Sequence, residues 1–149
     1  MAVYKACEIP EELSYDVGYD VWVRLEEDGT VTLGMTDPAQ ARCGRIVNIT
    51  FKAVGKALRR GQSAAIIESA KWVGPFPTPL TGVLVAVNEE FRKDILVANK
   101  DPYGRGWFVR LRPTKFEAER GFLMEGPAAV EAYRRKIDEL GVHCIRCAE

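Results

Sequence analysis

The sequence predicts a mainly β fold with short helices, in the form of a β-rich sandwich or flattened barrel. Three observations support this: many short apolar stretches, frequent glycine and proline turns between them, and few helical patterns. With 149 residues, 47% of them apolar and 28% charged, the chain has the composition of one globular domain. We expect one domain over residues 1–149, with a core over 21–114 and a C-terminal helical extension over 115–149.

The first expected elements precede Lys71. Residues 21–35, "VWVRLEEDGTVTLGM", alternate apolar and polar residues around an Asp-Gly turn, which predicts a β-hairpin. The segment "TDPAQARCG" predicts a short helix with its N-cap at Asp37, a proline at the first helical position and a stop at Gly44. "RIVNITF" and "SAAIIES" predict two strands, separated by the turn-bearing loop "AVGKALRRGQ". The second of these strands ends just before Lys71.

The stretch after Lys71, "GPFPTP", is expected to be stiff, extended and outside any regular ladder, because proline lacks a backbone N–H and restricts the residue before it. "TGVLVAVN" then predicts a strand, "EEFRKDILVAN" a short helix and "GWFVRLRP" the last strand. Beyond Pro113, "EGPAAVEAYRRKIDELG" predicts a C-terminal amphipathic helix. Its apolar face is formed by Val130, Tyr133, Ile137 and Leu140.

Charge and hydropathy exclude some classes of partner. The 21 basic and 21 acidic residues cancel, so no global positive field favours a nucleic-acid backbone. The N-terminus lacks the pattern of a signal peptide, and no stretch approaches the roughly 18 apolar residues of a membrane helix. We therefore expect a cytoplasmic protein that binds neither nucleic acid nor membrane.

Four cysteines, at positions 7, 43, 144 and 147, are too few for a disulfide scaffold and fit a reducing compartment. Cys144 and Cys147 form a C-x-x-C, a spacing that suits redox chemistry or half of a zinc site. If the termini meet, Cys7 could complete a metal site or form a disulfide with either of them. We rank redox-active or sulfur-accepting thiols above metal binding, and leave an inert tail open. Cys43, among apolar neighbours, is expected in the core.

Four separated blocks of the chain resemble the glycine cleavage H-protein family of small lipoyl carriers. They lie in the family's order and at nearly its spacing, between about Val21 and Thr114. The blocks are "VWVRLEEDGTVTLGMTDPAQARCGRIV", "ESAK", "TPLTGVLVAVNE" and "NKDPYGRGWFVRLRPT". The resemblance implies a barrel-sandwich hybrid of the lipoyl- and biotinyl-domain type. It also implies that Lys71, the lysine of "ESAK", carries lipoic acid as an amide on its side-chain nitrogen.

The surroundings of Lys71 fit this role. A strand-end turn lets a lipoate-attaching enzyme reach the amine, and the prolines that follow would hold the turn rigid. Glu68, at the same strand end, is expected to help that enzyme dock. Biotinyl lysines typically lie between two methionines, whereas the neighbours here are Ala70 and Trp72, so lipoate is favoured. Trp72 is either an aromatic that docks a partner or a side chain packed against the sheet edge.

The resemblance implies a carrier rather than an enzyme. The reactive thiols would belong to the cofactor, and the polypeptide would supply position and access. A catalytic triad would depend on His143, the only histidine. We therefore expect no catalytic residues and no metal site, and we expect a monomer, since a carrier must visit several enzymes.

Departures from the usual pattern suggest which carrier this is. Glycine-cleavage members usually read "HEWV" and "ESVKAASD" where this chain reads "DVWV" and "ESAKWVGP". With cysteines near both termini, the chain resembles a sister group, the lipoate-binding proteins of the sulfur-oxidising heterodisulfide-reductase-like system. That resemblance implies a sulfur-containing intermediate on the arm at Lys71, delivery to the reductase-like complex, and recycling by a dihydrolipoamide dehydrogenase.

Two other functions stay open. The first is a glycine-cleavage H-protein, carrying an aminomethyl group between a pyridoxal-dependent decarboxylase and a tetrahydrofolate-dependent transferase. The second is an unmodified interaction module, in which Trp72 and the C-terminal helix would bind the partner. Only the second alternative leaves Lys71 unmodified.

Overall fold

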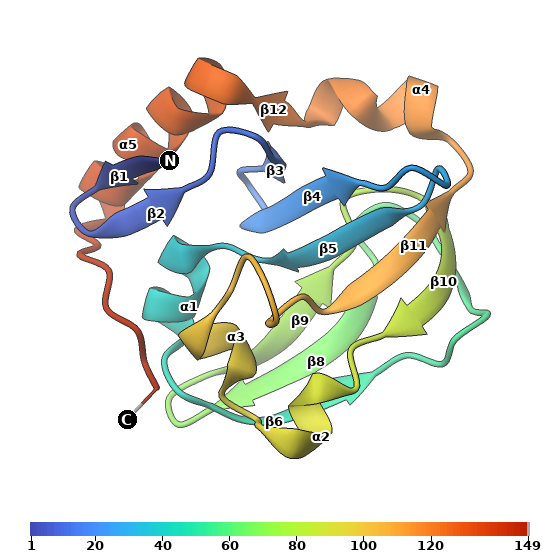
Figure 1. Cartoon of the computed structure of the whole chain (residues 1–149), viewed down its shortest axis with the longest axis horizontal. Coiled ribbons are helices and arrows are strands. Elements are labelled where there is room, and N and C mark those ends of the chain that lie inside the picture. The colour runs from blue at the N-terminus through green and yellow to red at the C-terminus, as the bar shows by residue number, and fades with distance from the viewer. Residues whose placement is uncertain (149) are drawn as a thin grey trace.

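The strands form three antiparallel sheets in residues 1–148, the part of the chain that the computed structural model describes (Figure 1). The large sheet has the order β12-β3-β4-β5-β11-β10-β7, with strands at Met124–Glu125, Ser14–Asp16, Val21–Leu25, Val31–Met35, Val109–Pro113, Gly82–Val87 and Ala57–Leu58. The second sheet, β6-β8-β9, comprises Ile46–Phe51, Ser63–Ser69 and Val73–Pro77, and β1 (Ala2–Tyr4) pairs with β2 (Cys7–Ile9). The helices are α1 (Asp37–Cys43), α2 (Glu90–Lys93), α3 (Val97–Lys100), α4 (Phe116–Glu119) and α5 (Gly126–Leu140), with a 3₁₀ turn at Arg120–Phe122.

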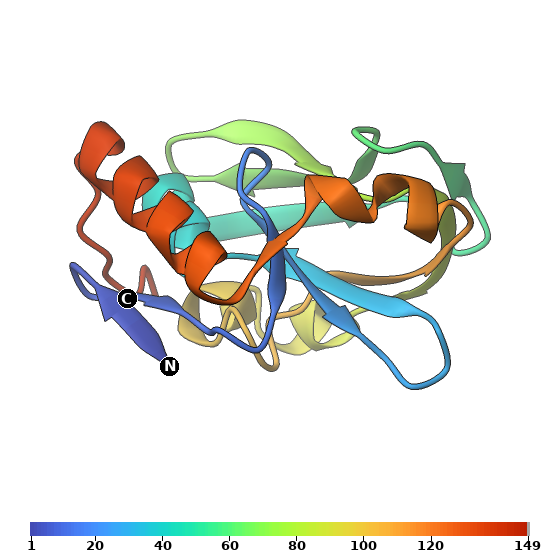
Figure 2. The same ribbon diagram turned by 90° about the horizontal axis from the view of Figure 1, so that it is seen from above.

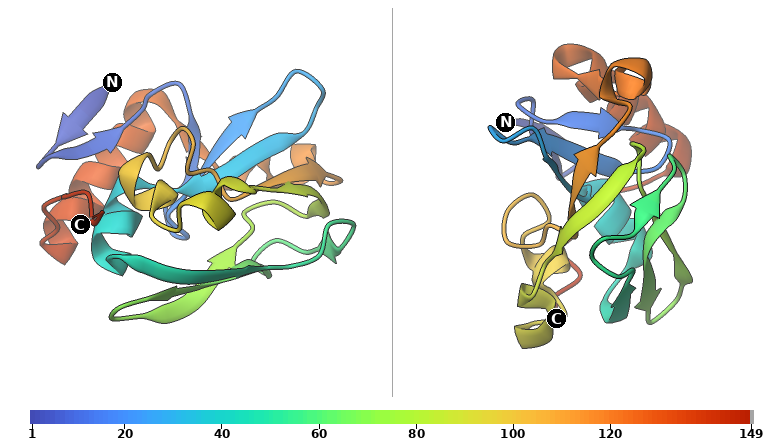
Figure 3. Two further views of the ribbon diagram at one scale, coloured as in Figure 1. Left: turned by 60° about the horizontal axis from the view of Figure 1, so that its bottom comes forward. Right: turned by 90° about the vertical axis from the view of Figure 1, so that its right-hand side faces the viewer.

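The main core lies between the large sheet and the β6-β8-β9 sheet, which face each other in Figure 3. Phe76 of β9 stacks on Phe108 with ring centroids 4.3 Å apart, and Phe91 of α2 meets Phe108 edge-on at 5.2 Å. Offset and edge-on aromatic pairs are favourable packing geometries. The predicted fold, mainly β with short helices and a C-terminal helix, is confirmed.

A second apolar cluster lies under α5, which packs on β3 and β12 (Figure 2). Tyr15 of β3 meets Tyr133 of α5 edge-on at 5.5 Å, and the buried Trp22 donates its indole N–H to the Pro102 carbonyl at 2.9 Å. Gly34 lies opposite Trp22 in the β4–β5 ladder, where an added Cβ would come within 2.4 Å of the indole ring. Residues that precede 21 and residues that follow 114 in the sequence therefore also contribute buried side chains.

The predicted hairpin and first helix are confirmed, with one shift. Strands β4 and β5 pair antiparallel over residues 21–35, as the alternation indicated. Helix α1 begins at Asp37 and ends before Gly44, but its N-cap is Thr36, whose hydroxyl accepts the Ala39 N–H at 3.2 Å. Thr36 holds the extended backbone that a capping residue adopts, and Asp37 is already helical.

The expectation that "GPFPTP" stays outside a ladder is wrong. Strand β9 covers Val73–Pro77 and pairs antiparallel with β8, with Gly74 opposite Ile67 and Phe76 opposite Ala65. Proline is tolerated in a strand where the missing N–H has no ladder partner, which is the situation at a sheet edge. In the described residues β9 is an edge strand, and Pro75 and Pro77 take alternate positions along it.

Other elements differ from expectation in detail. The loop "AVGKALRRGQ" contains the short strand β7, and the strand predicted as the last is followed by β12. The stretch "EEFRKDILVAN" folds as two single turns, α2 and α3, because the Asp94 carboxylate accepts the Leu96 N–H at 3.0 Å between them.

The C-terminal helix α5 is confirmed, with a changed apolar face. Tyr133 and Ile137 are fully buried and Val130 is partly buried, whereas Leu140 is 48% exposed and Ala129 is buried. No helix among residues 1–148 is long and apolar enough to cross a membrane.

Candidate functional site

Lys71 lies on the turn that joins β8 to β9. The Ser69 N–H donates to the Trp72 carbonyl at 2.7 Å and closes the turn. The Ala70 N–H donates to the Arg45 carbonyl at 3.2 Å, which ties the turn to the segment between α1 and β6. The backbone around Lys71 is therefore held on both sides, while its side chain is exposed to solvent.

Gly44 provides the surface along which the Lys71 side chain lies. Its φ of +83° belongs to a region that favours glycine, and it ends α1. A Cβ at this position would come within 2.9 Å of Lys71 Cε, so the missing side chain leaves space for the lysine. The sequence predicted Gly44 as a helix stop, but this second role comes from tertiary structure.

A cavity of about 570 Å³ lies beside Lys71. The turn before β4, helix α1 and the β8–β9 hairpin line it, mostly with apolar atoms. An exposed amine, the space above Gly44 and this cavity together fit an acylated lysine side chain. Lys71 would hold a lipoyl group there, and that group supplies a dithiol–disulfide pair when bound.

The charged pair Asp20 and Arg42 also lines this cavity. Asp20 Oδ2 lies 3.3 Å from Arg42 Nη1, and Asp20 Oδ1 lies 2.9 Å from Lys136 Nζ of α5. The Tyr133 hydroxyl also donates to Asp20 Oδ1 at 3.3 Å. No sequence pattern predicted that Asp20, Arg42 and Lys136 meet at a site. The one signal was Asp20 at the position of the family's "HEWV" histidine.

Cys43, the neighbour of Arg42 on α1, lines the same cavity and is buried, which confirms its predicted place in the core. Burial raises the pKa of its thiol, so Cys43 stays protonated and neutral near pH 7. The cavity therefore contains an uncharged thiol.

Glu68 and Trp72 flank the Lys71 turn. Glu68 is partly buried on β8 opposite Val73, and its Oε1 accepts the Asn48 Nδ2–H at 3.3 Å. Trp72 is 41% exposed, yet its ring covers Gly74, where an added Cβ would come within 2.0 Å of the indole. Trp72 therefore packs at the sheet edge and also exposes part of its ring beside the lysine.

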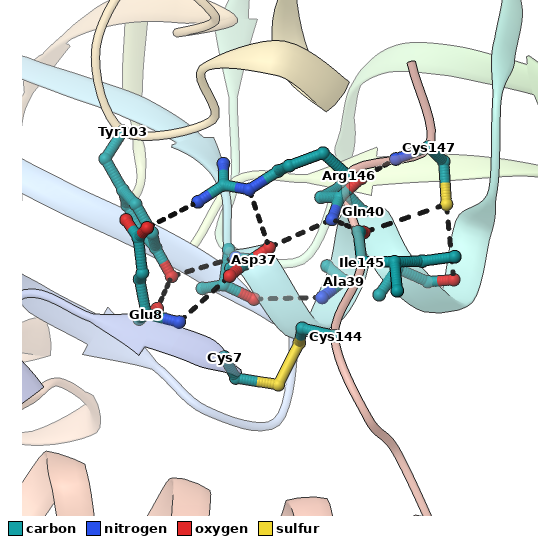
Figure 4. The surroundings of a disulfide bond; sticks show 12 residues. Cys7, Glu8, Asp37, Ala39, Gln40, Tyr103, Cys144, Ile145, Arg146 and Cys147 are labelled. Atoms are coloured by element: carbon teal, nitrogen blue, oxygen red, sulfur yellow. Dashed lines mark hydrogen bonds and ion pairs between the residues drawn. A yellow bond between two sulfur atoms is a disulfide. The ribbon is translucent and has the colours of Figure 1, made fainter. Parts of the chain in front are cut away.

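The terminal cysteines do not form one thiol cluster (Figure 4). Cys7 and Cys144 form a disulfide, with an S–S distance of 1.97 Å and Cα atoms 4.9 Å apart, which is one of the two disulfide pairings left open for Cys7. The Cys144 N–H also donates to the Lys5 carbonyl at 3.0 Å, in the turn between β1 and β2. Cys147 is a free thiol, near the Ala41 and Ile145 carbonyls. No group of three potential metal-ligating side chains occurs within residues 1–148.

The chain after Cys144 forms a short tail, and polar contacts hold this tail against helix α1 (Figure 4). Arg146 lies 3.5 Å from the Asp37 carboxylate and 3.1 Å from that of Glu8. The Gln40 side chain donates to the Ile145 carbonyl at 2.5 Å and accepts the Cys147 N–H at 3.2 Å. Contacts from the tail therefore hold α1, the helix that carries Arg42 and Cys43, in place.

Comparison with known proteins identifies the family. The family model described as glycine cleavage H-protein matches residues 13–136. The chain belongs to the glycine cleavage H-protein family. Members carry a lipoate covalently attached to a lysine, and they act as carriers rather than as enzymes. In general they interact with a lipoate-attaching enzyme and with dihydrolipoamide dehydrogenase.

Three relatives of this H-protein family member show how far the likeness extends. Glycine cleavage system H protein 3 of Aquifex aeolicus is 44% identical over 97% of this chain and 91% of the relative. The glycine cleavage system H protein of a Psychrobacter species is also 44% identical, over 70% of this chain and 82% of the relative. The crystal structure of a glycine cleavage system H protein from Mycobacterium marinum matches with a TM-score of 0.72 and 29% identity, over 90% of this chain and all of that chain. This neighbour supports the barrel-sandwich fold of the lipoyl type.

Proposed function

We propose that this lipoyl carrier holds its lipoate on Lys71 and shuttles a sulfur-containing intermediate in cytoplasmic sulfur oxidation by a heterodisulfide-reductase-like complex. Residues 1–149 would act as one monomeric unit, built from a core over 21–114 and an extension over 115–149. The dihydrolipoamide dehydrogenase would recycle the arm. Exposed and braced by its turn, Lys71 has the position that attachment requires.

The observation that carries the sulfur assignment is the rebuilt surface around Lys71. Trp72 and Val73, which replace the usual "AA" after the lysine, are 41% and 66% exposed and would offer a partner an apolar contact. Asp20, in place of the "HEWV" histidine, lines the cavity with Arg42. The Aquifex relative matches at the ends of the chain as well, whereas the Psychrobacter relative, equally identical, matches 70% of it. This supports a subgroup with its own terminal segments.

Individual residues take defined parts in this proposal. The Lys71 amine forms the amide, and Glu68, three residues earlier on β8, offers a carboxylate to the lipoate-attaching enzyme. Trp72 contacts the partner complex. Cys147 is the remaining candidate for a sulfur-accepting thiol, since Cys7 and Cys144 are joined in the disulfide.

The first test is the intact mass of the protein made with its native lipoate-attaching enzymes. We expect a one-lipoyl increase for the wild-type chain and for Lys56→Arg, an exposed lysine outside the hairpin, and no increase for Lys71→Arg. No increase in the wild-type chain, under conditions that lipoylate a known H-protein, would favour the unmodified interaction module.

A second test separates the two cargoes. The lipoylated protein is offered to the reductase-like complex with a reduced sulfur substrate, and in parallel to a glycine decarboxylase with glycine. Sulfur loading on the arm, seen by mass, is the expected result. Loading with an aminomethyl group alone would instead establish the glycine-cleavage function, which the names of the relatives describe.

A further inference from the structure

The cavity beside Lys71 is lined by charged as well as apolar side chains. Three charged side chains line it: Asp20, Arg42 and Lys71. Both oxygens of Asp20 are engaged by cations, Oδ2 by Arg42 at 3.3 Å and Oδ1 by Lys136 at 2.9 Å. The negative charge of Asp20 is therefore outweighed by the two positive charges that pair with it.

Lipoylation removes one positive charge but does not reverse this balance. An amide on Lys71 is neutral, and the buried Cys43 stays a neutral thiol because burial raises its pKa. In the lining, the Arg42 cation and the Asp20 carboxylate remain. Asp20 is also paired with the Lys136 cation, which lies outside the lining, so the three groups together carry one positive charge. Such a site attracts an anion and repels a cation, more strongly in a partly enclosed cavity than in bulk water.

Arg42 has the geometry to contact such an anion. It lies in the last turn of α1, and its side chain is 46% exposed. A guanidinium carries five N–H donors in a planar fork, and in residues 1–148 the one ion pair of Arg42 is its contact with Asp20. The remaining N–H donors of Arg42 suit an oxyanion. The contacts of the C-terminal tail with Gln40 and Asp37 keep α1 in place.

We propose that Arg42 is a specificity-determining residue, which binds the anionic end of a sulfur cargo, such as a sulfonate group, when the loaded arm at Lys71 enters this cavity. The inference rests on the proposed function and deepens it by naming the class of cargo. A cationic aminomethyl group would meet Arg42 at the same place and be disfavoured.

The probe is sulfite, which opens the oxidised arm without any oxidant or reductant. The S–S bond of the lipoyl ring breaks, one sulfur takes the sulfonate group, and the other leaves as a thiolate that takes up a proton. Sodium sulfite is titrated into the lipoylated protein, and the equilibrium constant is measured by intact mass. A Lys71→Arg sample gives the background, including any reaction at the Cys7–Cys144 disulfide.

One variant that removes a positive charge and one that removes a negative charge separate an effect of charge on sulfite loading from a general loss of structure. We expect Arg42→Gln to weaken sulfite loading by about three- to tenfold and Asp20→Asn to strengthen it by a similar factor. Asparagine tolerates the left-handed φ of +59° at position 20. Arg42→Lys keeps the charge but loses the planar fork of donors, so its constant should lie between those of wild type and Arg42→Gln. Arg92→Gln, whose side chain is 83% exposed on α2, should leave the constant unchanged.

The outcomes distinguish this proposal from the one on which it rests. Equal constants for wild type and Arg42→Gln, with the arm lipoylated, would overturn the role of Arg42 and leave the carrier function intact. A sulfonate signal of the same size in Lys71→Arg would overturn attachment at Lys71, and this proposal with it. Loss of loading in Asp20→Asn would also contradict the charge argument.

Discussion

Gly44 links the end of a helix to the space that Lys71 occupies. Its φ of +83° and the 2.9 Å approach of a built Cβ to Lys71 Cε are separate constraints. The first acts on the backbone and therefore on stability. The second acts on the lysine side chain and therefore on access to the amine.

Gly44→Ala should destabilise the fold by about 1–3 kcal/mol, because a side chain is strained at this backbone conformation. It should also slow lipoylation, since the new methyl group displaces Lys71. Gly55→Ala is the matched control, with a φ of +97° and nothing within 4 Å of its Cβ. Urea unfolding and the lipoylation rate check both effects. A lipoylation defect of equal size in Gly55→Ala would rule out the contact with Lys71 as the cause.

Asp37, which pairs with Arg146 of the C-terminal tail, gives the stability of the fold a pH dependence. Burial raises the pKa of this carboxyl group, against the opposing effects of the Glu8 N–H, Gln40 and Arg146. The folded state then holds the proton more tightly than the unfolded state. The stabilisation is fully present below the ordinary pKa of about 3.9 and is lost as pH rises through the raised value.

Unfolding free energies of wild type and Asp37→Asn, measured from pH 3 to pH 7, check this. Relative to the variant, wild type should lose stability as pH rises. A difference that stays constant over this interval would show that folding does not shift the pKa of Asp37. Glu11→Gln, a change at an exposed residue, serves as the control.

At the scale of elements, strand β9 shows a limit of local sequence reasoning. The prolines predict that this stretch lies outside a ladder, yet β9 pairs with β8 along Val73–Pro77. The proline rule depends on whether a strand lies at an edge, and sheet order is a tertiary property. The first twenty residues were likewise not predicted as strands, because β1, β2 and β3 are three residues each.

Of the candidate site, the sequence predicted the position of Lys71 but not the residues that come to it from other parts of the chain. The "ESAK" block and the strand before it placed Lys71 on an exposed turn, where the structure has it. Asp20, Arg42 and Lys136 come from distant parts of the chain and meet only in the fold. No local spacing connects them. The pairing of Cys7 with Cys144 rather than Cys147 was also left open, since it depends on how the tail crosses the β1–β2 hairpin.

The prolines of β9 should also protect its outer edge. An unpaired edge strand with free N–H groups invites pairing with another chain. Replacing both Pro75 and Pro77 by threonine should therefore promote self-association, measured by sedimentation over a range of concentrations. Pro127→Ala, at the exposed start of α5, should leave the protein's sedimentation unchanged. Unaltered sedimentation of the double variant would show that other features protect this edge.

At the scale of the whole molecule, the disulfide connects residues 137 positions apart. Closing so long a loop restricts the unfolded chain, so reduction, or serine at both Cys7 and Cys144, should lower stability by about 2–5 kcal/mol. Cys147→Ser should have little effect, since that thiol is free. Thermal unfolding with and without reductant measures the difference. An unchanged midpoint on reduction would contradict this role.

The same bond makes most of the polypeptide a covalent ring. A single protease cut within the ring, for example at the exposed turn around Gly55, would yield a nicked chain that stays one molecule, and two cuts would be needed to release a fragment. Gel analysis without reductant would then report a nicked protein as intact. The ring also suggests a split form of the protein, made as two chains that end at that turn and joined by the disulfide between Cys7 and Cys144.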